Sequence, residues 1–399
     1  MDLRTSLDRP ASVPFKYNPA LDGIRGVGIL VVVFGHYAAG MSLWAREQFF
    51  GLSVTIDLFF VLSGYLITAL LLEEWSKTGQ ISMRKFYVRR GLRLLPALYL
   101  LLAFVTLAAL FTDWLPVSTK LALAEVAAAA LYVYPIILAT KGESAFLLHL
   151  WTLSVEEWFY FIWPGVLLLV GLKPGTAIRF RLVIAALIAL CVGMMAIRFA
   201  GLEDGLSSLL LRLRPDSLAY GALLAIGLRK LNDVTTPRIE RTLGIVGPIG
   251  FLALLYFELF AAYPRQPGVD YEHYQIQAFG SITYQLAIWS CFFAIGHLVN
   301  KPKGYVSRAM SNRPLMYLGI LSYAIYLWHQ PLFLILNQEQ FFNGDPNGSG
   351  APTVGQMWMF GLAVTVLTLV VAFISRHLVE LPALRMKKRF EPVQYAGKR

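Results

Sequence analysis

The sequence predicts an all-α, polytopic membrane helix bundle. Of its 399 residues, 57% are hydrophobic and only 15% are charged, which leaves too little polar surface for a soluble protein. Apolar runs of about 20 residues alternate with short charged loops, as expected for helices that span a bilayer. No stretch has the length or pattern of a separate soluble domain.

Eleven apolar segments follow one another along the chain. The first follows about 20 mostly polar residues and has no small-residue cleavage site after it, so we expect a retained span rather than a signal peptide. The segments lie near residues 24–40, 53–72, 94–111, 121–139, 151–171, 182–200, 208–228, 243–262, 277–297, 314–336 and 357–375.

The distribution of positive charge predicts how these segments are oriented. If the N-terminus is cytoplasmic, the inner flanks and loops hold 27 of the 35 Lys and Arg residues, whereas the outer loops hold four. This imbalance follows the positive-inside rule. The net charge of +11 therefore reflects topology, and we expect no nucleic-acid partner.

Both termini are then cytoplasmic, which requires an even number of crossings, yet there are eleven segments. Three segments between residues 94 and 170 must make two crossings. We expect about 10 crossings plus one re-entrant or broken segment, with 11 spans as the alternative. The stretch from Leu121 to Trp158 is the expected irregular part because it contains Glu125, Lys141, Glu143, His149 and Glu156.

The first apolar segment contains two groups that hydrocarbon disfavours. Arg25 lies at its polar end and His36 near its far end, eleven residues later. In a helix the two residues share one face about 16 Å apart. An arginine at the boundary extends to water at little cost. An imidazole deep in a span is costly, so His36 is a candidate functional residue.

Polar residues also occur in the next two segments. Asp57 indicates a buried partner or cavity, or alternatively a solvated position at the outer interface. Ser63 precedes a glycine, and close helix contact is the favoured interpretation. Arg90 and Arg93 would project from one helical face and fit phosphate oxygens, although topology or anionic-lipid contacts would equally require them. Pro96 is expected to start the third span.

The segment HLWTLSVEEWFYFIWP, from His149 to Pro164, has adjacent carboxylates at Glu156 and Glu157. On a helix they diverge by about 100°, so only one can face a given partner. A carboxylate in apolar surroundings is a candidate for holding a histidine tautomer or carrying a proton. Trp151 and the neighbouring aromatic residues would alternatively form an interfacial belt.

Three further residues are candidates near span ends. Arg214 and Asp216 would form a local ion pair, a structural device or part of an outward-facing acceptor site, of which we favour the structural role. His329 lies in the apolar run LSYAIYLWHQPL. The two cysteines lack metal-ligand spacing and are expected in the core, and no metal site is predicted.

Five stretches, taken in order, resemble the bacterial acyltransferase-3 family, and the resemblance extends from Asn18 to about Leu384. Members are integral membrane acyltransferases that move acetyl or other acyl groups from acyl-CoA to surface glycans and related acceptors. The stretches are LDGIRGVGILVVVFGH, FFVLSGYLIT, FYVRRGLRLLPALYL, HLWTLSVEEWFYFIWP and SYAIYLWHQPL.

The family's motifs fall on specific residues of this sequence. The arginine, ten residues, histidine motif matches Arg25 and His36, and the arginine, two residues, arginine motif matches Arg90 and Arg93. The Trp-Ser-Leu-Ser-Val-Glu motif matches the segment that begins at Trp151, with threonine in place of the first serine.

The resemblance implies a role for each ionisable residue that is unfavourable inside a membrane span. His36 is the expected base that takes the acceptor's hydroxyl proton, or alternatively a transient acyl carrier, and Glu156 is expected to orient or charge-balance it. Arg90 and Arg93 are expected to hold the phosphates of coenzyme A at the inner face, with Arg25 guiding the thioester arm.

The resemblance also implies partners and a location. We expect no permanently bound cofactor, acyl-CoA (acetyl-CoA) as donor substrate, a carbohydrate acceptor, membrane lipids around the protein, and the bacterial cytoplasmic (inner) membrane as its site. Some members carry a C-terminal hydrolase-like domain. This sequence ends at Arg399 without one, so any hydrolase-like or glycan-export function is expected in a separate partner, or in none.

The expected organisation is a polar tail at 1–19, an acyltransferase-3-like membrane domain at 20–384 and a basic cytoplasmic tail at 385–399. A transporter, or a conduit for acyl groups or protons, is the alternative function, since buried His, Asp and Glu also form proton relays. Transporters often contain inverted repeats, and none is visible here. A structural envelope subunit would leave the histidine and arginine motifs without a purpose.

Overall fold

The computed structural model describes residues 17–41, 51–136, 146–171, 176–202, 205–232, 237–259, 282–336 and 354–387. Within these ranges the chain is helical and has no strand, which confirms the predicted all-α class. The elements are α2 (Pro19–Met41), α4 (Gly51–Thr78), α5 (Met83–Phe111), α6 (Thr119–Ala130), α8 (Leu150–Gly171), α9 (Thr176–Ala200), α10 (Gly205–Leu213), α11 (Pro215–Asn232), α12 (Pro237–Leu259), α14 (Ile282–Asn300), α15 (Tyr305–Met310), α16 (Arg313–Leu336), α17 (Val354–Ser375), the π-helix η1 (Arg376–Glu380) and α18 (Leu381–Lys387).

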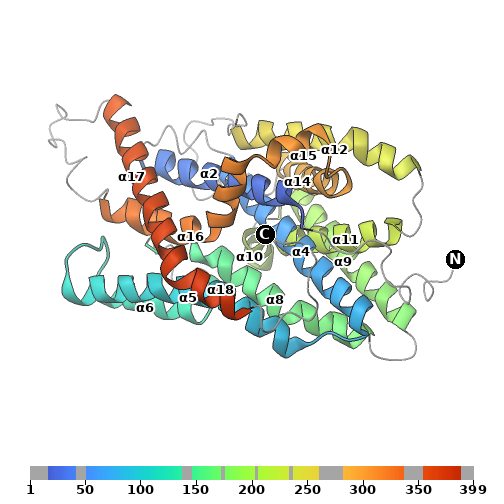
Figure 1. Ribbon diagram of the computed structural model, residues 1–399, viewed down its shortest axis with the longest axis horizontal. Coiled ribbons are helices and arrows are strands. Elements are labelled where there is room, and N and C mark those ends of the chain that lie inside the picture. The colour runs from blue at the N-terminus through green and yellow to red at the C-terminus, as the bar shows by residue number, and fades with distance from the viewer. Residues whose placement is uncertain are drawn as a thin grey trace.

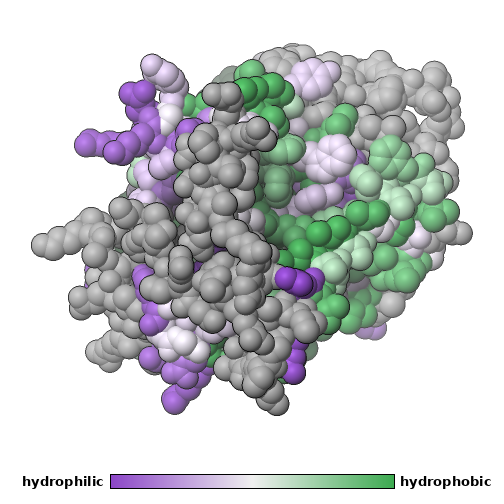
Figure 2. All heavy atoms as spheres, turned by 90° about the vertical axis from the view of Figure 1, so that its right-hand side faces the viewer, coloured by the Kyte–Doolittle hydropathy of each residue, from purple (hydrophilic) through white to green (hydrophobic). Residues whose placement is uncertain are grey.

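Six helical segments in the described ranges are long and apolar enough to cross a membrane. Many outward-facing side chains on them are apolar, among them Leu182 and Val192 on α9 and Leu362 on α17. Figure 2 shows apolar side chains gathered over much of the described part of one face. The chain is therefore a multi-pass membrane protein, while about 10 crossings and two cytoplasmic termini stay predictions. The segments are Pro19–Tyr37, Val54–Thr78, Met83–Phe111, Arg179–Ala200, Arg313–Leu336 and Trp358–Met386.

The stretch expected to be irregular contains the short helix α6. Its 12 residues span about 18 Å, less than the roughly 30 Å hydrocarbon core. Soon after α6 the chain turns at Tyr132, which has a left-handed φ of 56°. Glu125 of α6 is buried and accepts hydrogen bonds from the Tyr134 hydroxyl and the Leu147 N–H. Buried, satisfied polar groups of this kind make irregular backbone tolerable. Residues 141 and 143 lie outside the described ranges.

Helix α5 differs from the prediction at its start. It begins at Met83 and continues through Pro96 to Phe111, so the expectation that Pro96 starts the helix is wrong. The apolar run begins later than the helix does, and proline is tolerated inside membrane helices because neighbouring groups satisfy the freed carbonyl. Arg90 and Arg93 consequently project from a regular helix.

The packing of α2 against α16 positions the site. These two helices make extensive contact, as do α4 with α11 and α12 with α14 (Figure 1). Gly26 of α2 lies against the backbone of α16, where an added Cβ would overlap the Leu315 carbonyl oxygen. Gly319 of α16 lies equally close to the Asp22 carbonyl oxygen of α2. Two backbones therefore touch along this seam, and side chains further along both helices face each other.

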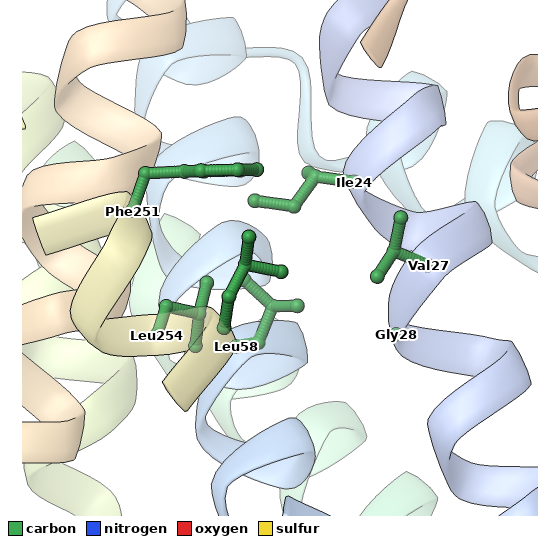
Figure 3. A pocket seen from close by; sticks show the side chains of 7 residues that line it. Ile24, Val27, Gly28, Leu58, Phe251 and Leu254 are labelled. Carbon is green, nitrogen blue, oxygen red and sulfur yellow. The ribbon is translucent and has the colours of Figure 1, made fainter. Parts of the chain in front are cut away.

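A small gap in the packing lies between α2, α4 and α12. Ile24, Leu58, Phe251 and Leu254 point toward it, and the side chains drawn in Figure 3 carry only carbon. Its volume of about 10 Å³ is that of a single water-sized probe. It is a packing defect rather than a substrate site.

Candidate active site

Two histidines from distant parts of the chain meet in the C-terminal halves of α2 and α16. His36 Nδ1 lies 3.2 Å from His329 Nε2, and the ring centroids are 4.9 Å apart. His36 Nδ1 also lies 2.9 Å from the carbonyl oxygen of Val32, one turn earlier. His329 is 0% exposed, whereas His36 is partly exposed. Of the two rings, His36 is therefore the one that a substrate can reach.

A third histidine, His149, completes this group just before α8. Its ring packs edge-on against His329 with centroids 5.2 Å apart, and its Nε2 lies 3.3 Å from the Leu327 carbonyl oxygen. The Tyr326 hydroxyl donates to the His149 carbonyl oxygen. Thr152 Oγ1 lies 2.5 Å from the same hydroxyl, so the threonine that replaces the family's serine contributes its hydroxyl to this network.

Each of the three imidazoles directs one ring nitrogen at a backbone carbonyl. His36 and His149 point at carbonyls of Val32 and Leu327, and His329 at the Tyr326 carbonyl oxygen 2.7 Å away. A carbonyl oxygen only accepts, so each of these nitrogens carries a proton, and the second nitrogen of each neutral ring keeps its lone pair. Among the described residues, no group of three or more His, Cys, Asp or Glu side chains is placed to hold a metal ion.

An arginine centre lies nearer the start of α2 and α5. Arg90 donates two hydrogen bonds, of 2.9 and 2.7 Å, to Glu157 Oε1, and its guanidinium stacks 3.2 Å from the Tyr160 ring centroid. Arg93 is exposed and lies within electrostatic range of Arg25 and Arg90. The structure therefore brings together the three arginines, and of the two carboxylates it is Glu157 that pairs with Arg90.

Glu156 belongs to this arginine centre and not to the histidines. Its Oε1 accepts a hydrogen bond of 2.9 Å from Ser63, its Oε2 lies 3.4 Å from the Tyr160 hydroxyl, and the charge of Arg25 acts on it. Arg25 and His36 are about three helical turns, or roughly 16 Å, apart on α2. No hydrogen bond joins Glu156 to His36 within the described ranges. The expected role of Glu156 in orienting or charge-balancing His36 stays a prediction, because its hydrogen-bond partners lie elsewhere.

A cavity opens beside the arginine centre, between α5 and α8. Its volume is about 390 Å³, within the usual range for ligand pockets. Arg90 and Glu157 lie at its polar part, and Leu94, Leu131 and Phe161 contribute apolar wall. An amphipathic molecule matches this lining, with a polar group at the ion pair and an apolar portion along the leucines.

Two buried ion pairs connect α4, α9, α11 and α14. Asp57 accepts from Ser217 and Tyr284, both at 2.5 Å, and its Oδ2 lies 3.4 Å from Arg214 Nη1. Asp57 is thus fully buried and partnered rather than solvated. It is separate from the histidines.

The second buried pair joins Asp216 of α11 to Arg198 of α9. Asp216 receives two hydrogen bonds from Arg198, of 2.6 and 3.1 Å, and the pair is fully buried. Interhelical pairs of this kind support the favoured structural role.

Three tryptophans of α8 have partners within the protein. Trp151 packs edge-on against Phe60, with the Arg214 guanidinium 5.9 Å from its ring. Trp163 donates a hydrogen bond of 2.8 Å to Thr68 Oγ1. Trp158 donates one of 2.9 Å to the Tyr132 carbonyl oxygen in the turn after α6. Partners within the protein favour a packing role for these three residues, and the interfacial belt stays an alternative.

The comparison with protein families covers both groups of residues. The Acyl_transf_3 family, whose description is an acyltransferase domain, matches residues 18–377. The chain belongs to this family. The match contains both the histidine group and the arginine centre.

Curated relatives of this acyltransferase-family chain are about equally distant from it. It is 29% identical over 332 residues to peptidoglycan O-acetyltransferase OatA of Listeria monocytogenes, covering 80% of this chain and 50% of that protein. It is 29% identical over 400 residues to O-acetyltransferase OatA of Staphylococcus aureus, covering 96% of this chain and 60% of that protein. The chain thus spans half to 60% of the length of these relatives. No solved structure matches it.

Sequence reasoning missed several residues of this acyltransferase-family site. Tyr326 holds both His329 and His149, yet a tyrosine in an apolar helix is a common core residue. Arg198 lies near the end of an apolar segment, and nothing in the sequence indicates its partner Asp216. The available signal for Tyr326 was its position three residues before His329, on the same helical face.

Proposed function

We propose that this chain is a membrane acyltransferase that moves an acyl group, most often acetyl in this family, from acyl-CoA to a hydroxyl group of a cell-surface or exported glycan. Family membership and the O-acetyltransferase names of the two relatives support acyl transfer, and the Listeria relative's name supports a glycan acceptor. The observation that carries the proposal is the accessible imidazole of His36, held by His329, on the same helix as Arg25 at the arginine centre. Peptidoglycan is the acceptor class that the Listeria relative's name supports.

In this proposal the donor binds first at the arginine centre. Arg93 and Arg25 are the best candidates for contacting the coenzyme A phosphates, because Arg93 is exposed and Arg25 has only a long 3.9 Å contact with Asp22. Arg90 is paired with Glu157 already, so its proposed role is to shape the neighbouring cavity. An extended pantetheine arm would then carry the thioester from the arginines to His36, roughly 16 Å along α2.

The chemistry proposed at His36 is general-base catalysis. Its Nε2 accepts the proton of the acceptor hydroxyl as the oxygen attacks the thioester carbon, which forms a tetrahedral intermediate. When this intermediate collapses, the C–S bond breaks and the imidazolium returns the proton to the coenzyme A thiolate. The products are the acyl ester and free coenzyme A, so no further reactant is required.

Purified protein with radiolabelled acetyl-CoA tests the proposal. We expect coenzyme A release and label transfer that depend on an added glycan such as a peptidoglycan fragment. Reconstitution in vesicles with donor enclosed distinguishes the alternative: label that crosses the membrane without forming an ester would indicate a conduit. The matched control is the His36→Ala protein, which should be inactive but should elute in detergent at the same volume as the wild type.

A further inference from the structure

The hydrogen bonds of His36 and His329 determine which nitrogen of each ring carries the proton. His329 Nδ1 lies 2.7 Å from the Tyr326 carbonyl oxygen and His36 Nδ1 lies 2.9 Å from that of Val32. Because a carbonyl oxygen only accepts, both Nδ1 atoms are N–H donors in the neutral rings. His329 Nε2 is then an acceptor, and it lies 3.2 Å from the His36 N–H.

We propose that His329 is the positioning residue that holds His36 in its Nδ1–H tautomer, which leaves His36 Nε2 as the lone pair that receives the substrate's proton. This inference rests on the proposed acyl transfer and assigns to His329 the role that a carboxylate has in the Ser-His-Asp triad. An acceptor behind the imidazole both fixes the ring and stabilises the imidazolium that forms.

Burial separates the roles of the two rings. His329 is 0% exposed and is enclosed by α2, its own helix and the His149 ring, so it has no route to a substrate. His36 is partly exposed, and within the described ranges its Nε2 has no recorded hydrogen-bond partner. His329 therefore acts through His36 rather than on the reacting atoms.

Other groups do not fit this orienting role. Glu156 is bound to Ser63 near the arginines. His149 directs Nε2 at the Leu327 carbonyl oxygen, and its buried Nδ1 has no partner among the described residues. Its ring packs against His329, and no hydrogen bond joins it to His36 among the described residues. Besides the Val32 carbonyl oxygen on the same helix as His36, the neutral imidazole of His329 is thus the acceptor that the described part of the chain offers to the His36 N–H.

Two substitutions at position 329 test the role in catalysis. His329→Leu keeps volume but removes the acceptor, and His329→Gln places an amide oxygen near the lost Nε2. We expect His329→Leu to lower kcat about 100-fold, as expected for a misplaced catalytic group, with an unchanged KM for acetyl-CoA. The kcat of His329→Gln should be about tenfold higher than that of His329→Leu. Equal activity of the leucine and wild-type proteins, or equal losses in both variants with matched thermal stability, would overturn the proposal.

A second readout separates this inference from the acyl-transfer proposal. Nitrogen-15 spectra of histidine-labelled protein report which ring nitrogen is protonated, and comparison with His36→Asn assigns the His36 signals. We expect His36 as the Nδ1–H form in the wild type and a mixture of forms in His329→Leu. An Nε2–H form of His36 in the wild type would disprove the positioning role even if the protein transfers acyl groups. The Nδ1–H form in a protein without transferase activity would refute only the enzymatic proposal.

Discussion

His36 Nδ1 and His329 Nε2 lie 3.2 Å apart although 293 residues separate them in the chain. This contact depends on the seam between α2 and α16, where Gly26 and Gly319 let the two backbones touch. A side chain at either glycine would separate the helices before the histidines meet. The geometry of the proposed base is therefore set by packing two or three turns away.

Substitution of Gly26 by Ala tests this dependence. The added Cβ would overlap the Leu315 carbonyl oxygen, so α2 must shift away from α16 and His36 must leave His329. We expect at least a 100-fold loss of acyl transfer, because displacements of about 1 Å have effects of this size. Gly193→Ala on α9 is the matched control, since its Cβ meets nothing within 4 Å. It should retain wild-type activity; full activity in Gly26→Ala would contradict the account.

Arg93→Lys tests donor binding at the arginine centre. The substitution keeps the charge but removes the guanidinium fork that suits phosphate oxygens. Loss of a charged hydrogen bond corresponds to about 1.5–3 kcal/mol, so we expect KM for acetyl-CoA to rise roughly tenfold or more while kcat changes little. Arg84→Lys, at an exposed position of the same helix, serves as the control. An unchanged KM in Arg93→Lys would favour a role in topology alone.

Substitution of Asp57 by Asn tests whether the buried ion pairs are structural. The amide leaves Arg214 without its carboxylate in a fully buried position, and removing one partner of a buried pair costs about 3–5 kcal/mol. We expect a loss of that size in the free energy of unfolding in mixed micelles. Asp113→Asn, at an exposed position, should change it by less than about 0.5 kcal/mol. A stable Asp57→Asn protein with a raised acceptor KM would instead indicate an acceptor site.

Local geometry made parts of the site predictable from the sequence. The eleven-residue spacing of Arg25 and His36 defines their shared face on any helix, and the three-residue spacing of Arg90 and Arg93 does the same. The divergence of adjacent carboxylates correctly indicated that Glu156 and Glu157 would have different partners. These statements need only the pitch of a single helix.

Contacts between helices could not be predicted in the same way. That His329 rather than Glu156 faces His36 depends on how α16 and α8 lie against α2, which no periodicity within one segment encodes. The start of α5 was missed because hydropathy detects only the apolar part of a helix. The helix begins at Met83, in the polar residues that precede the apolar run. The partners of Asp57 likewise come from two other stretches of chain, at residues 214–217 and at Tyr284.

The most direct measurement of the central claim is acyl transfer from radiolabelled acetyl-CoA to a glycan fragment by wild-type and His36→Ala proteins, each shown to bind the donor equally. General-base catalysis contributes about 10²–10⁴-fold, so we expect the variant to lose at least 100-fold in kcat with donor affinity unchanged. Transfer by His36→Ala at the wild-type rate would contradict the account.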